Sequence, residues 1–227
     1  MIWINFIFKV TAAFDECISR GMISDFLKHI FPRVVLEKNL RFSYTFCLGG
    51  LAFTTFLIML ASGMLLLVYY QPTPERAFSS ILFLESSVRG GKYLRSLHRL
   101  TSHVLILLIL LHTLRVILTG AYQRPRQLNW VIGCLLLFLA LFEAYTGYLL
   151  PFDQLAFWAT QTGMELLTVL PLGTFLRSLL VPDGVGEPLS LLRFYALHIA
   201  IIPLSLLLLS FLHFYRVRKN KGVLPYL

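Results

Sequence analysis

The sequence predicts an all-α membrane protein: four transmembrane helices packed as one bundle, with an amphipathic helix on the membrane surface before them. Its composition is 57% hydrophobic and 14% charged, with a mean hydropathy of +0.75. These values lie outside the usual range of soluble globular domains. Four apolar runs each have the roughly 20 residues needed to cross about 30 Å of hydrocarbon. A chain of 227 residues therefore has room for one bundle rather than two independent domains.

The first 40 residues contain no run long enough to span a membrane. Charged residues such as Lys9, Asp15 and Arg20 alternate there with apolar residues at helical intervals. This pattern is typical of a helix that lies in the membrane interface. A cleaved signal peptide is less expected than a surface helix, because the apolar run is short and no clear small-residue cleavage site follows it. We divide the chain into an amphipathic segment, residues 1–40, and a bundle domain, residues 41–227.

The four predicted spans are residues 46–70, 97–118, 130–150 and 196–215. Four spans place both termini on one side of the membrane. That side carries twelve Lys and Arg residues against seven on the other, so the positive-inside rule places both termini on the inner, negative (n) side. The expected location is a bacterial inner membrane or an equivalent energy-transducing membrane.

The net charge of +9 and the three cysteines exclude other classes of protein. In a chain this apolar the positive charge indicates contact with the lipid bilayer, and no nucleic-acid partner is expected. Cys17, Cys47 and Cys134 are too few and too irregularly spaced for a disulfide framework. No CxxCH motif is present, which excludes ordinary c-type haem attachment.

Two of the spans carry histidines in matched pairs. His98 and His112 are fourteen residues apart, and His198 and His213 are fifteen apart. Each pair is separated by roughly 21 to 22 Å along a helix. The first spacing leaves its side chains within about 40° of one face and the second within about 60°, of which supercoiling absorbs only a part. Ionisable residues inside a membrane usually have a function, so we interpret the pairs as two stacked cofactor sites.

Bis-histidine haem is the cofactor that fits this pattern. Low-spin haem iron takes one imidazole from each side of the ring and needs no other protein ligand. Zinc would require further cysteine or carboxylate ligands, which the sequence does not place at these depths. His98 and His198 would bind iron near the outer, positive (p) side, and His112 and His213 near the n side. The fifth histidine of these helices, His103, points about 140° away from His98 and is expected to pack against another helix or a haem edge.

Glycines and arginines on the spans extend this interpretation. Gly49 and Gly63 in the first span, like Gly133 and Gly147 in the third, repeat the fourteen-residue spacing. Alone they would indicate small-residue helix packing, but in register with the histidines they predict room for a flat cofactor. Arg95 and Arg115 lie one turn outside the histidines His98 and His112 and are expected to bind haem propionates.

Several segments together resemble the cytochrome b6 type of cytochrome b, the shorter, split form. They are FCLGG in the first span, RSLHR and LHTLRV in the second, TGYLLPFDQLAFWAT at the end of the third, and LLRFYALHIAIIPL with LHFYRVRKNKG at the fourth. The resemblance covers roughly residues 35–223. It implies a four-helix dihaem bundle, with the four histidines as the ligands of two b haems.

The resemblance also implies further functional residues. Cys47 matches the cysteine that forms one thioether bond to a third haem on the n side, and Arg218 matches an arginine near the propionates of that haem. Tyr148, Pro151, Phe152 and Asp153 match part of a p-side quinol-oxidation pocket, where the family commonly has PWDQ and this chain has PFDQ. Glu143 departs from the family pattern; it is either a neutral acid in an apolar site or an aid to p-side proton release.

The implied function is that of the haem-binding core of a quinol-oxidising complex. Electrons from p-side quinol would pass through the b haems to n-side quinone, coupled to proton translocation in a respiratory or photosynthetic chain. The implied partners are a subunit carrying the C-terminal half of cytochrome b, a Rieske iron-sulfur protein and a c-type cytochrome, in a dimeric complex. The chain would not be active alone.

Two other functions stay open from the residues alone. One is a dihaem membrane anchor that links a peripheral dehydrogenase to the quinone pool. The other is a transporter or assembly protein whose histidines bind protons or metal, which would predict acidic residues across the bundle centre. Apart from Glu143 the centre has none.

Overall fold

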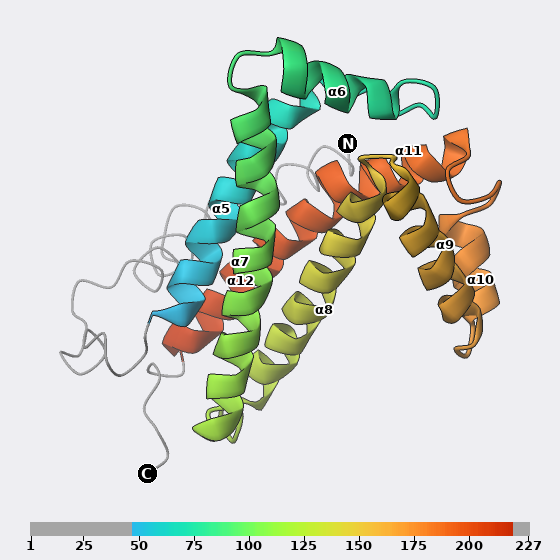
Figure 1. Cartoon of the computed structure of the whole chain (residues 1–227). Coiled ribbons are helices and arrows are strands. Elements are labelled where there is room, and N and C mark those ends of the chain that lie inside the picture. Colours follow the sequence, from blue (N-terminus) through green and yellow to red (C-terminus); the bar gives the residue numbers. More distant parts are fainter. Residues whose placement is uncertain (1–46, 220–227) are drawn as a thin grey trace, which may run out of the picture.

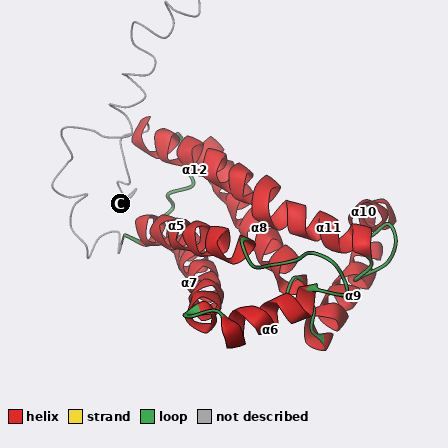
Figure 2. Cartoon of the chain, turned by 90° about the horizontal axis from the view of Figure 1, so that it is seen from above, coloured by secondary structure: helices red, strands yellow, loops and turns green. Residues whose placement is uncertain are grey.

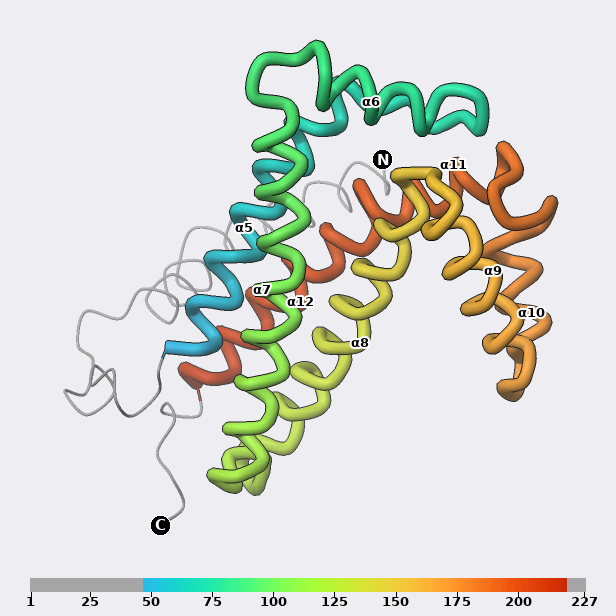
Figure 3. The backbone as a smooth tube through the Cα atoms, viewed as in Figure 1, coloured from blue at the N-terminus to red at the C-terminus, as the bar shows by residue number. Residues whose placement is uncertain are grey.

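The computed structural model describes residues 47–219, and all of its regular secondary structure within that range is helical (Figure 1). Four long apolar helices could cross a membrane: α5 (Leu48–Leu67), α7 (Gly91–Leu118), α8 (Gln127–Leu149) and a continuous rod over Pro188–Lys219. The rod consists of α11 (Pro188–Ala196), a π-helical turn η1 (Leu197–Ile201) and α12 (Ile202–Lys219). Figure 3 traces it as one path without an intervening loop. The all-α, four-span prediction is confirmed, while the predicted N-terminal surface helix lies outside the described residues.

Three shorter helices connect the spans. Helix α6 (Ala77–Ser87) lies across the end of the bundle between α5 and α7. Helices α9 (Gln154–Thr168) and α10 (Gly173–Leu180) follow α8 and form a group with α11 at one side of the bundle (Figure 2). The second and fourth spans begin earlier than predicted, because helix α7 and the rod continue for about one or two turns beyond their apolar stretches into charged sequence.

The bundle consists of two helix pairs. Helix α5 packs chiefly on α7, and α12 packs chiefly on α8. A buried apolar layer, including Phe56, Leu105, Ala140 and Leu206, has one residue from each of the four spans. Each of these residues on α5, α7 and α8 lies seven positions after the first residue of a fourteen-residue pair. The pairs begin at Gly49, His98 and Gly133, so the layer is halfway between the two histidine levels. It separates the two levels with a water-excluding core.

A second apolar cluster fixes the end of the bundle where α9, α10 and α11 meet. Leu149, Leu191 and Phe194 are fully buried in it. The hydroxyl of Tyr70 donates a hydrogen bond to the carbonyl of Leu150 at 2.7 Å, which joins the segment after α5 to the end of α8. This end of the chain is therefore held by packing and by a long-range hydrogen bond.

Candidate functional site

The four histidines meet in the two pairs that the sequence predicts. The ring centres of His98 and His198 are 6.3 Å apart, with 79° between the ring planes. Those of His112 and His213 are 6.4 Å apart, with 77° between the planes. An imidazole nitrogen binds a first-row metal at about 2 Å, and roughly 1 Å more reaches each ring centre, so one metal between two rings separates their centres by about 6 Å. Both pairs therefore fit one iron held between two imidazoles.

The histidines of each pair come from different halves of the bundle. His98 and His112 lie on α7, whereas His198 lies in the π turn η1 and His213 on α12. The π turn adds one residue to the rod: the amide of Ile202 donates to the carbonyl of Leu197, five residues back. The fifteen-residue spacing of the rod thereby matches the fourteen-residue spacing of α7. This is why the two levels have nearly the same ring geometry.

Each predicted glycine lies directly against one histidine ring. A methyl group built on Gly49 would lie 3.3 Å from Cε1 of His112, and one on Gly63 would lie 3.2 Å from Cε1 of His98. On α8, a methyl group on Gly133 would lie 3.3 Å from His213. The fourth glycine, Gly147, is the tightest, since its methyl group would come within 2.4 Å of Cε1 of His198. Each glycine thus makes room for an imidazole ring, which packs directly against the neighbouring helix.

Hydroxyl side chains and a carbonyl set the orientation of His98 and His198. Nδ1 of His98 lies 2.9 Å from the hydroxyl oxygen of Ser62, which itself donates to the Met59 carbonyl, so the histidine is the donor. Nδ1 of His198 donates to the carbonyl of Glu143 at 3.1 Å and also lies 3.4 Å from the Thr146 hydroxyl. A proton on Nδ1 leaves the Nε2 lone pair free to bind a metal.

The sequence interpretation missed these hydroxyl residues, although a signal for them exists. Ser62 directly precedes Gly63, and Thr146 directly precedes Gly147, so both glycines of this level follow a buried hydroxyl residue. No such residue precedes Gly49 and Gly133, the glycines of the other level. In the described part of the chain, neither His112 nor His213 has a hydroxyl side chain bonded to Nδ1, and His213 faces the backbone carbonyl of Asn129. The two levels therefore differ in the hydroxyl groups beside their histidines.

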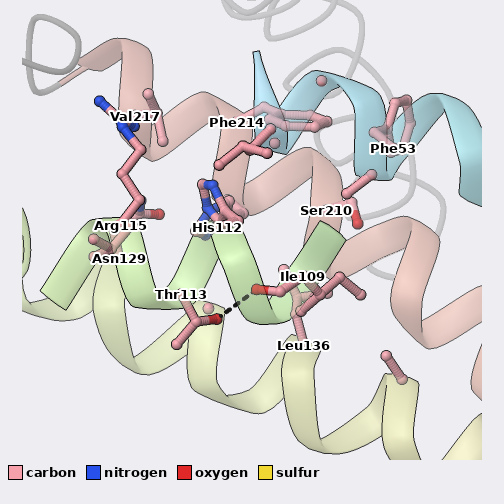
Figure 4. Close-up of a pocket in the computed structure, with 18 of the residues that line it drawn as sticks. Phe53, Ile109, His112, Thr113, Arg115, Asn129, Leu136, Ser210, Phe214 and Val217 are labelled. Atoms are coloured by element: carbon pink, nitrogen blue, oxygen red, sulfur yellow. Dashed lines mark hydrogen bonds between the residues drawn. The ribbon is translucent and has the colours of Figure 1, made fainter. Parts of the chain in front are cut away.

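A cavity of about 350 Å³ adjoins the pair formed by His112 and His213. Figure 4 shows His112 and Arg115 projecting from α7 toward Phe214 and Val217 of α12. Cys47, at the start of α5, also lines this cavity. Its size is within the range of small-molecule and cofactor sites. Arg218 follows Val217 on the last turn of α12.

The remaining predicted residues lie toward the end of the bundle nearer His98 and His198. Arg95 forms an ion pair with Glu85 of α6. Asp153 is the N-cap of α9 and accepts a hydrogen bond from the amide of Ala156 at 2.8 Å. Phe152 has a left-handed backbone with φ of 56°, a strained conformation for an aromatic residue. The side chain of Tyr148 is exposed.

Pro151 precedes Phe152 in this turn between α8 and α9. The sequence prediction for His103 is not met within this chain. Its side chain is exposed, and its Nδ1 donates to the carbonyl of Arg99 at 2.7 Å. Within residues 47–219, no cluster of three or more His, Cys, Asp and Glu side chains could hold a bare metal ion.

The fold and the site define an integral membrane protein with two facing pairs of histidines, stacked one above the other between its helix pairs. The family profile described as cytochrome b/b6/petB matches residues 34–221. The chain therefore belongs to the cytochrome b family, and membership of this family implies b-type haem.

Relatives in this family are similar over most of the chain. It is 43% identical over 174 residues to cytochrome b6 of Heliomicrobium gestii, covering 76% of this chain and 82% of that protein. It is 38% identical over 202 residues to the menaquinol:cytochrome c reductase cytochrome b subunit of Bacillus subtilis (strain 168), covering 88% and 90%.

A solved structure of a hyperthermophilic respiratory Complex III contains a similar chain. The TM-score is 0.77 at 30% sequence identity, and the match covers 94% of this chain. The chain spans 56% of the length of that solved chain.

Proposed function

We propose that this chain is the haem-binding core subunit of a membrane quinol:cytochrome c or plastocyanin-type oxidoreductase, active only within a multi-subunit complex. The observation that carries the proposal is the pair of matched histidine levels, with ring centres 6.3 and 6.4 Å apart. The names of the relatives, cytochrome b6 and the cytochrome b subunit of a menaquinol:cytochrome c reductase, support the same function.

In this proposal His98 and His198 hold the p-side haem b, and His112 and His213 hold the n-side haem b. When bound, the two haems supply one-electron carriers that connect p-side quinol with n-side quinone across the membrane. The chain itself keeps the Nδ1 protons in place on the p side through Ser62 and the Glu143 carbonyl. Its apolar layer excludes water between the two levels.

The orientation of the chain follows from its charges. The excess of Lys and Arg on the side of the termini supports an n-side location for both, in a bacterial inner membrane or its equivalent. The His112 and His213 level then faces the n side, and the α9 and α10 group faces the p side.

A third haem, bound covalently through Cys47, belongs to the proposal. Cys47 lines the same cavity as His112, Gly49 and Arg115. A thiol at this cavity could add across a haem vinyl group to form a thioether, and Arg115 could bind a propionate. Arg218, near the end of α12, is proposed as a further propionate ligand, and Arg95 as one on the p side.

The quinol would bind on the p side beside the turn between α8 and α9. The strained backbone of Phe152 and the exposed ring of Tyr148 support this location, because strain gathers at functional sites. Pro151 and Asp153 shape the same turn, Asp153 by capping α9. The proposed partners are a subunit carrying the C-terminal half of cytochrome b, a Rieske protein and a c-type cytochrome, in a dimer of the complex with proton translocation.

A reduced-minus-oxidised spectrum of the purified complex, with haem staining of a denaturing gel, tests the proposal. We expect b-type absorption from two haems per chain, and loss of the p-side signal alone in His198→Ala. Absence of b-type absorption would refute the haem-binding function. If the chain copurifies with a dehydrogenase and its complex cannot reduce cytochrome c with quinol, the membrane-anchor function is correct instead.

A further inference from the structure

A carboxyl group lies beside one of the four histidines, inside the membrane-spanning part of α8. Oε1 of Glu143 is 3.2 Å from Nδ1 of His198, and the two side chains are only 12% and 16% exposed. The other carboxyl oxygen, Oε2, is buried and has no hydrogen-bond partner among residues 47–219. A buried carboxyl in an apolar span is costly, so its position requires a compensating interaction.

The surroundings of His198 Nδ1 identify that interaction. The N–H donates to the backbone carbonyl of Glu143 at 3.1 Å, while the carboxyl oxygen of the same residue lies almost as near. Thr146 donates its own hydroxyl proton to that carbonyl at 2.9 Å. Two electron-rich oxygens of one residue thus face the Nδ1 proton. Acceptors at this nitrogen raise the basicity of the opposite nitrogen toward a metal.

Among the described residues, the other three histidines have no carboxyl group beside Nδ1. Nδ1 of His98 faces the neutral hydroxyl of Ser62 and the Met59 carbonyl, and His213 faces the backbone carbonyl of Asn129. Gly147, one turn from Glu143 on α8, brings the His198 ring into close contact with this helix. Among the four histidines, His198 is therefore the one with a carboxyl group beside its Nδ1 in the described part of the chain.

We propose that Glu143 is a positioning residue that holds His198 through Nδ1 and lowers the reduction potential of the p-side haem. The proposal rests on the proposed function, because it takes His198 as a haem ligand. A more basic imidazole donates more charge to the iron, which stabilises ferric over ferrous haem. The n-side haem, held by a different pair of rings, is unaffected.

Redox titration of the purified complex tests this, with the p-side and n-side haems followed separately by their absorption bands. In Glu143→Leu, which removes both carboxyl oxygens, we expect the redox equilibrium of the p-side haem to shift about tenfold toward the reduced form, or about 59 mV for one electron. Glu143→Gln keeps one oxygen acceptor and should give a smaller shift in the same direction. The electron paramagnetic resonance signal of the p-side haem should change in Glu143→Leu, because the ring loses a contact that fixes its orientation.

The n-side potential is the internal control, and Glu165→Gln is the matched variant. Glu165 is an exposed carboxyl on α9 that pairs with Arg177 at 3.0 Å, so its loss should move neither potential. An unchanged p-side potential in Glu143→Leu with both haems bound would overturn the proposal. Where Glu143→Leu fails to retain the p-side haem, Glu143→Gln decides, and an unchanged potential there overturns it equally. If His198→Ala keeps both haems, His198 is not a haem ligand and the proposed function is wrong. No result from the Glu143 variants leads to that conclusion, so the two failures can be told apart.

Discussion

The contact between Gly147 and His198 leads to the sharpest prediction, for the variant Gly147→Ala. The added methyl carbon would lie 2.4 Å from Cε1 of His198, 2.9 Å from Nδ1 and 3.0 Å from Nε2. Ordinary carbon contacts begin near 3.4 Å, so the ring or the helix must move by about 1 Å. Metal–ligand distances tolerate changes of only about 0.2 Å. We expect Gly147→Ala to lose or weaken the bond between His198 and the p-side iron.

The other three glycines provide graded controls within the same chain. Methyl groups on Gly49, Gly63 and Gly133 would lie 3.2 to 3.3 Å from their histidines, which requires movements of only about 0.1 to 0.2 Å. These variants should keep both haems with modest losses of stability, within the roughly 1 to 3 kcal/mol of ordinary overpacking. Gly133→Ala is the closest match, since it changes the same helix at the other level.

The measurement is the haem content per chain, with low-temperature spectra that separate the two b haems. In Gly147→Ala the p-side component should fall by more than half or become high-spin while the n-side component stays. If Gly147→Ala binds both haems in full with an unaltered p-side spectrum, the reasoning from ring contact is wrong. Equal damage from Gly133→Ala would contradict it too, because the structure assigns that site far less overlap.

Three further outcomes are expected. Cys47→Ser should abolish covalent haem staining on a denaturing gel, whereas Cys134→Ser, a change at the other cysteine of the same cavity, should preserve it. Tyr70→Phe should lower the free energy of unfolding in detergent by about 1 kcal/mol, measured by thermal unfolding, because the hydrogen bond to Leu150 is lost. Burial raises the pKa of Tyr70, so its hydroxyl remains a donor at neutral and mildly alkaline pH. Desolvation raises the pKa of Asp183, but hydrogen bonds from the Ser190 hydroxyl and from the amides of Leu189 and Ser190 outweigh it and lower the pKa. This group therefore stabilises the start of α11 above its unfolded pKa and loses the effect as pH falls through the folded pKa, so protease cleavage near α11 should increase in acid for the wild type and not for Asp183→Asn.

Much of the fold could be predicted because the membrane imposes a simple pattern. Spans follow from apolar length, and the pairing of four histidines follows from their spacing. The ends of the spans could not be predicted from hydropathy, because α7 and the rod continue as regular helices into charged sequence at Gly91 and Pro188. Helix α6 was missed because it is short and its residues carry no strong helical pattern.

Side-chain partners were harder to predict than positions along a helix. Arg95, which we propose as a propionate ligand, also pairs with Glu85 of α6, and this partner could not be predicted because the sequence did not predict α6. Glu143 was identified as unusual, but its neighbour is 55 residues away in the chain, and only the packing of α8 against the rod brings His198 to it. The strained φ of Phe152 likewise depends on the tight turn between α8 and α9.

The difference between the two histidine spacings shows how one residue can correct a register. In a regular α-helix the extra residue would rotate His213 by about 100°, from about 40° on one side of the shared face to about 60° on the other. The π turn at Leu197–Ile201 removes that difference, since its extra residue is absorbed within one wide turn. Pro203 gives a physical reason for the turn to lie there. It has no N–H to donate to the carbonyl of Ile199, and its ring would collide with that carbonyl in a regular α-helix. Widening the helix at His198 relieves this conflict and aligns both levels. Pro203, which would disrupt a regular α-helix, thus helps to align the two histidine pairs.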